Sequence, residues 1–201
     1  MKGRSQIKNL FIDTCELSNV VLNWYGESIE KLGLYSEAYH SAAPSLLKDL
    51  SDEQLRDISA CPVVFLYRMC LELSLKSILV SGSRILRLQG EPFSTTEKIL
   101  AKGHNLFELL KELRALYEQL GWAWDSEHDE IGGTINEFNK NDPGSFCFRY
   151  PVNMRGENAL DRDFRFDLSN FSTRMDGVLT FLDHVDCGVM GVLDETQQVN
   201  S

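Results

Sequence analysis

Three charged residues spaced by four are the feature of this sequence that most suggests chemistry. Arg68, Glu72 and Lys76 interrupt the apolar stretch 61–80, and residues four apart share one face of an α-helix. Such a stripe could face water, where each ion pair would contribute about 0.2–0.5 kcal/mol. It could instead form a buried polar seam that needs partners from elsewhere in the chain. Because apolar side chains surround the stripe, we predict that it is partly buried.

Two other places in the chain could supply such partners. His104 directly precedes a leucine-rich segment, where the dipole of a helix disfavours the charged imidazole and favours a local hydrogen bond. Arg149 and Tyr150 open a segment that is rich in arginine, although the chain as a whole is acidic. These arginines are either balanced by nearby aspartates or form an anion-binding lip.

Nothing in the sequence predicts a metal site. The five cysteines have no Cys-x-x-Cys spacing, and the acidic residues of the run 125–130 are consecutive, so a helix would point them in several directions. We interpret this run as a solvated first turn of a helix, where the dipole favours negative charge. We also predict no cofactor.

The apolar periodicity predicts the helices that position these residues. A buried helix spans 61–80 and ends at Ser81 and Gly82, since glycine readily ends a helix. A leucine-rich helix follows Asn105 as its cap and stops at Gly121. The pattern also predicts helices over 7–32, 125–140 and 168–185, and a brief one after Thr95 or Thr96. The segments 34–45 and 83–103 are predicted to be mainly connectors.

Two short segments alternate apolar and polar residues with period two, at 146–150 and 164–166. The first follows the turn signal at 141–144, so we predict a small β-hairpin near residues 146–166. The sequence thus favours an all-α protein, a four- to five-helix bundle with this hairpin. Residues 1–187 are predicted to form a single domain, and residues 188–201 a frayed C-terminal tail.

Composition restricts the classes of partner. The chain has 201 residues and a formal net charge of −10, which argues against binding duplex DNA. We expect no signal peptide and no membrane span, because charged residues interrupt both apolar stretches that could serve. An odd number of cysteines in apolar surroundings suits free thiols in a reducing compartment, so we expect a cytoplasmic protein.

Several of these features also occur in the order of a known family. The chain resembles the HEPN superfamily, nucleotide-binding helical domains shared by higher eukaryotes and prokaryotes. The resemblance covers roughly residues 60–185 and rests on four pieces: Arg68-x-x-x-Glu72-x-x-x-Lys76, Gly103-His104-Asn105-Leu106, Asn141-Asp142-Pro143 and Phe148-Arg149-Tyr150-Pro151. It implies a helical bundle, often paired as a homodimer, in toxin–antitoxin or other conflict systems. Many members are metal-independent ribonucleases, and others only bind RNA, nucleotides or proteins.

This chain departs from the ribonuclease members, which carry an arginine, then four to six residues, and then a histidine. No arginine here is followed by a histidine at that distance. We therefore expect a non-catalytic domain that binds a partner protein, nucleotide or RNA in a conflict or mobile-element system. One alternative is a divergent ribonuclease in which folding joins Arg68, His104 and Arg149, and another is a dimeric scaffold. In each case we predict that Glu72 accepts from Arg149 or from the turn 103–104.

Overall fold

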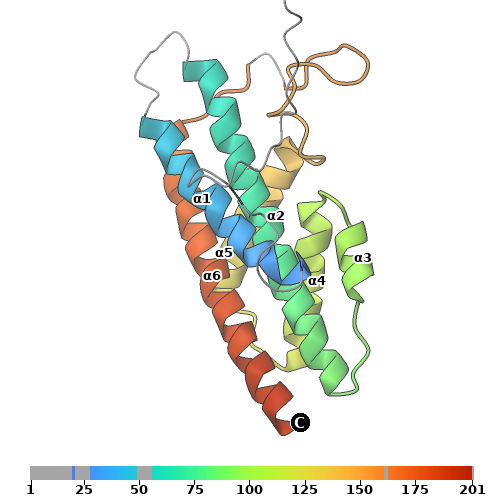
Figure 1. Ribbon diagram of the computed structural model, residues 1–201. Coiled ribbons are helices and arrows are strands. Elements are labelled where there is room, and N and C mark those ends of the chain that lie inside the picture. The colour runs from blue at the N-terminus through green and yellow to red at the C-terminus, as the bar shows by residue number, and fades with distance from the viewer. Residues whose placement is uncertain (1–19, 21–27, 49–55, 161–162, 201) are drawn as a thin grey trace, which may run out of the picture.

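A computed structural model describes residue 20 and residues 28–48, 56–160 and 163–200 (Figure 1). These residues form one 3₁₀ helix, η1 (Ser28–Lys31), and six α-helices, with no strand among them. The α-helices are α1 (Leu32–Lys48), α2 (Arg56–Leu88), α3 (Thr96–Ala101), α4 (Leu106–Leu120), α5 (Ser126–Asn141) and α6 (Leu168–Val199). The prediction of an all-α protein is confirmed.

Helix α2 lies at the centre of the molecule, in contact with α1, α3, α4 and α6. It is apolar nearly all round, as its sequence predicts, and it supplies much of the buried core. Its almost fully buried apolar side chains include Val63, Val64, Tyr67, Leu71, Leu75 and Ile78. A helix in this position fixes every element that packs on it, so charges on α2 are presented to several neighbours at once.

Helix α6 runs parallel to α2 in a constant register (Figure 1). Tyr67, Ser77 and Ser81 each donate a hydrogen bond to the α6 residue 109 positions later in the chain: Asp176, Asp186 and Met190 respectively. Because the offset does not change over this length, the two helices stay side by side with no slip. Helix α1 crosses the same face in the opposite direction, with Ser36 bonded to the carbonyl of Cys70 and to the Ser74 hydroxyl.

Helix α2 does not end at Ser81 and Gly82 as predicted, but continues to Leu88. Ile85 and Leu86 are buried, so the core extends past the glycine. A Cβ on Gly82 would lie 2.4 Å from Leu116 Cδ2, which shows that the glycine serves the close approach of α4. Tertiary packing therefore outweighs the low helix propensity of glycine at this position.

The N-terminal prediction is wrong where it can be compared. The segment 34–45, expected to be a connector, belongs to α1, and Gly33 lies in the first turn of that helix instead of ending one. The residues of α1 that face α2 are small, such as Ser36 and Ala43, so the apolar period is weak although the contact is close. Most of the helix predicted over 7–32 lies outside the described residues.

The last helix is longer than predicted. Helix α6 continues through residues 188–199, which were expected to be a frayed tail, and its Val189 and Leu193 are buried. Its three glycines, Gly177, Gly188 and Gly191, weakened the sequence pattern. Packing against the C-terminal half of α2, where Ser81 bonds to Met190, stabilises this part of α6 despite its low helix propensity.

The predicted β-hairpin near residues 146–166 is not present in the described part of that segment. Val152 and Asn158 form one isolated antiparallel bridge, and no strand extends from it. The Asp142 carboxylate accepts hydrogen bonds from the backbone N–H groups of Phe146 and Cys147. Because these N–H groups bond to a side chain, they hold the backbone in a turn and are not available for the hydrogen bonds of a β-ladder.

Helices α3 and α4 start after the caps that the sequence predicts, and α5 starts within one residue of its predicted beginning. Thr95, Asn105 and Asp125 each accept a backbone hydrogen bond at the N-terminus of α3, α4 and α5 respectively. Gly121 ends α4 in the left-handed conformation, with φ of 69°. Asn139 on α5 adds a second support for α4, because its side-chain oxygen accepts from the Leu106 N–H.

Candidate functional site

Glu72 is the centre of a buried ionic cluster. Its carboxylate is 3.5 Å from Arg68 Nη1 and 2.7 Å from Lys76 Nζ, both on the same face of α2. His104 Nδ1 lies 2.8 Å from Glu72 Oε2. Glu72 is only 3% exposed and Arg68 is 0% exposed, so the charged stripe is buried, as the apolar surroundings predicted. One carboxylate is thus surrounded by three groups that can donate to it.

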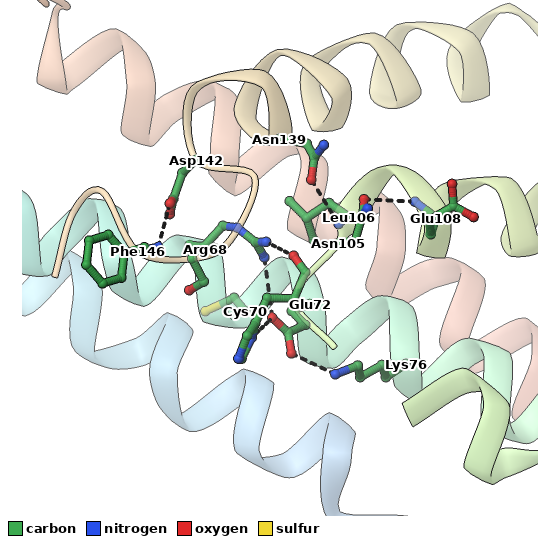
Figure 2. Close-up of polar contacts among 12 residues, drawn as sticks. Arg68, Cys70, Glu72, Lys76, Asn105, Leu106, Glu108, Asn139, Asp142 and Phe146 are labelled. Atoms are coloured by element: carbon green, nitrogen blue, oxygen red, sulfur yellow. Dashed lines mark hydrogen bonds and ion pairs between the residues drawn. The ribbon is translucent and has the colours of Figure 1, made fainter. Parts of the chain in front are cut away.

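Arg68 links α2 to the turn that precedes α4 (Figure 2). Its Nη2 donates to the backbone carbonyl of His104, while Nη1 donates to Glu72. Burial lowers the pKa of the guanidinium, and the nearby charges of Glu72 and Asp142 act in the opposite direction. An arginine stays protonated in such surroundings, so it acts here as a fixed internal cation.

Asp142 brings the loop after α5 to the same cluster (Figure 2). The residue is fully buried, and one of its oxygens accepts from the backbone of Phe146 and Cys147. Its other oxygen, Oδ2, and Arg68 Nε have no hydrogen-bond partner among the described residues. The negative charge of Asp142 balances Arg68 electrostatically, so the loop is tied to α2 by charge as well as by packing.

Arg149 contacts α2 in a different way from that predicted. Its guanidinium lies 5.7 Å from the ring centroid of Phe65 on α2 and 5.6 Å from that of Tyr150. It bonds to the carbonyl of Ser145, and the structure gives it no hydrogen bond to Glu72. Of the two partners predicted for Glu72, the structure therefore supplies the turn at His104 and not Arg149. Arg149 and Tyr150 are both exposed at the surface.

The cluster can hold a histidine ring in one orientation. A carboxylate only accepts, so the proton of neutral His104 is on Nδ1, and Nε2 is the nitrogen with a free lone pair. The His104 side chain is 50% exposed. A histidine oriented by a carboxylate can act as a base. Arg68, however, is fully buried and cannot contact a phosphate group outside, so the second element of the ribonuclease chemistry is not available at this position.

A second polar cluster, joining α1, α2 and α6, was not predicted. Asp176 Oδ1 lies 2.8 Å from Tyr67 Oη and 2.8 Å from His40 Nε2. Farther along α6, Asp186 accepts a hydrogen bond from Ser77, while its Oδ1 is buried with no partner among the described residues. The only signal in the sequence was the presence of polar residues within the apolar patterns of α2 and α6. This signal does not predict which residues pair, because the register of the two helices is not known from the sequence.

The chain was compared with known proteins in three ways, and no protein-family model, curated protein or solved structure matches it. The resemblance to the HEPN superfamily therefore stays a prediction from the residue pattern. In the described ranges, no helix is long and apolar enough to cross a membrane. The same residues include no group of three or more His, Cys, Asp or Glu side chains arranged to hold a metal ion.

Removing the central carboxylate should destabilise the fold strongly. In Glu72→Ala, Arg68 and Lys76 would be left buried without their shared partner, so we expect a loss of about 3–5 kcal/mol in the free energy of unfolding. Arg149→Ala should cost only about 0.5–1 kcal/mol, because it removes an exposed cation–π contact. Urea denaturation measures both. Glu108→Ala, which removes an exposed ion pair on α4, is the control. Equal losses in all three variants would contradict a central role for Glu72.

The partly buried Asp186 should make stability depend on pH. Burial raises the pKa of its carboxyl above the ordinary value of 3.8, so the folded state holds the proton more tightly than the unfolded state. This group therefore destabilises the fold progressively as the pH rises from the unfolded pKa through the folded one. Asp186→Asn removes that effect and should raise the Tm at pH 7, with a gain that shrinks as the pH falls toward about 4.

The matched control for this experiment is Asp194→Asn, which changes an exposed carboxyl on the same helix. We expect the control to change the Tm little and without a pH trend of this kind. Thermal melts from pH 4 to 8 test the point. A gain for Asp186→Asn that is the same at every pH, or equal to that of the control, would show that burial of Asp186 is not the cause.

Proposed function

We propose that this chain is a non-catalytic, HEPN-like helical domain that acts by binding a protein partner, in a conflict or mobile-element system. The observation that carries the proposal is the use of the ionic residues. Arg68, the arginine that the ribonuclease alternative would use, is buried and pairs with Glu72, and Glu72 also pairs with Lys76. These residues stabilise the bundle, and recognition is left to the surface.

A protein is the partner that the surface favours over a nucleotide or RNA. The loop between α5 and α6 exposes apolar side chains, with Met154 98% exposed and Tyr150 and Val152 more than 40% exposed. Exposed apolar groups gathered on one segment are typical of protein-binding surfaces. The net charge of −10 opposes the approach of a polyanion. A second copy of the chain is one such partner, in agreement with the predicted homodimer.

The partner proposal can be tested on Met154. Because its side chain is almost fully exposed, Met154→Glu should leave the Tm unchanged while it places a charge in the proposed surface. Val199→Glu, also at an exposed apolar residue but at the end of α6, is the control. We expect Met154→Glu alone to weaken the self-association seen by light scattering, or the recovery of a partner in affinity purification. If both variants retain every interaction of the wild type, this surface is not the one used.

A divergent ribonuclease is the second candidate, and the Glu72–His104 pair favours it. A carboxylate that fixes Nδ1 leaves Nε2 oriented as a base on a half-exposed ring. A ribonuclease would also need a cation that can contact the substrate, and Arg149 is the exposed arginine of the pattern. We rank this candidate second because Arg68 cannot take part.

Incubation with total RNA in the presence of a chelator separates the two candidates. If the domain is non-catalytic, the wild-type protein and His104→Ala should leave RNA equally intact, as seen by gel electrophoresis. Both proteins are purified in the same way, so a contaminating nuclease would appear in both. Cleavage by the wild type that is absent from a folded His104→Ala would overturn the non-catalytic proposal and support the ribonuclease.

A further inference from the structure

Five phenylalanine side chains form a closed ring of contacts near the N-terminus of α6. Successive ring centroids are 5.6–6.3 Å apart around the whole circle, and most of the contacts are edge-to-face. The members, in the order of their contacts, are Phe138, Phe148, Phe164, Phe166 and Phe171. They come from α5, from the loop that follows it and from α6, so three segments of the chain build one aromatic structure.

This ring surrounds a cavity of about 150 Å³. All five phenylalanines line the cavity, together with Val64 of α2 and Met175 of α6. A cavity of similar size in another protein, lined by apolar side chains, stays dry and binds benzene. The cavity is open to solvent on one side, so a ligand can enter it without unfolding of the helices.

The rim of the cavity carries hydrogen-bond acceptors. Asn141 donates its side-chain N–H to the carbonyl of Glu137, which leaves its own side-chain oxygen as an acceptor. Asp167 uses one carboxylate oxygen to cap α6 at Asn170 and keeps the other. Arg174 is the cation of the rim, and it already donates to Thr134 and pairs with Glu137 at 3.8 Å. The free side-chain oxygens of Asn141 and Asp167 can therefore each accept a hydrogen bond from a ligand at the rim.

From this arrangement we infer that the cavity binds a single aromatic ring system that carries an N–H or O–H donor, such as an indole or a phenol. An added ring can make the same edge-to-face contacts that the phenylalanines make with one another. Its donor would meet the acceptors of Asn141 or Asp167 at the rim. The ring can come from the tryptophan or tyrosine side chain of a protein or from a free small molecule.

Indole is the first probe, added to the full-length protein and followed by isothermal titration calorimetry and by the rise in Tm. We expect saturable one-to-one binding. Toluene, which has no donor, should bind at least tenfold more weakly. Binding of toluene as tight as that of indole would overturn the role of the rim acceptors, and the absence of binding by indole and p-cresol alike would overturn the site.

Asn170→Trp tests the location of the site by blocking its mouth. Asn170 is exposed at the rim, and the bond that caps α6 uses its backbone N–H, so the substitution should leave the fold intact. Ser169→Trp adds the same bulk one residue away, at an exposed position that does not line the cavity. We expect Asn170→Trp to weaken indole binding at least tenfold and Ser169→Trp to leave it within twofold. Equal effects, or none, would place indole elsewhere.

A peptide arm distinguishes the two sources of the ring. N-acetyl-tryptophanamide carries the indole on a peptide backbone, and its binding at the same site would support a protein side chain as the ligand. Binding by free indole alone would support a small molecule, and would leave the site correct. Neither result depends on the Met154 surface, so failure of the proposed protein partner and failure of this cavity can be told apart.

Discussion

A buried carboxylate that must be neutralised is the constraint on which the rest of this fold depends. Glu72 lies in the middle of an apolar helix, and a charge in that position is tolerated only when cations and hydrogen-bond donors surround it. Arg68 and Lys76 come from the same helix, but His104 comes from the turn before α4. Because Arg68 also binds the His104 carbonyl, the charge of one side chain on α2 fixes where a second helix begins.

The need to neutralise buried charge also involves the loop between α5 and α6. Arg68 is a buried cation, and its partner Glu72 also pairs with Lys76. The negative charge of Asp142 therefore helps to balance the charge of Arg68. Asp142 in turn shapes the backbone that carries Arg149 and Tyr150, since it accepts the N–H groups that a strand would use. Successive electrostatic interactions thus connect Glu72 in the core with the exposed loop, which carries the apolar surface and part of the phenylalanine ring.

The sequence predicted the parts of this arrangement that depend on local chemistry. The cap at Asn105, the stop at Gly121 and the burial of the charged stripe follow from side-chain types and spacing. The lengths of α1, α2 and α6 could not be predicted in this way. Small residues such as Ser36 and Gly82 lie inside helices because another helix packs closely against them, and this packing cannot be read from the local sequence. The residues of the site could be predicted, but the partner of Glu72 could not. Nothing in the local sequence distinguishes His104 from Arg149 as that partner.

The division between core and surface is the reason for proposing binding as the function. Catalysis by Arg68 would require its guanidinium to be free to contact a substrate, but here it is bonded to two fixed partners at 0% exposure. Exposing it would leave Glu72 with one cation fewer in an apolar setting, at a cost of about 3–5 kcal/mol, which is a large part of the stability of a small domain. The ionic residues are thus fixed by folding, and the groups still free to meet a ligand are those of the loop, the phenylalanine ring and the outer edge of His104.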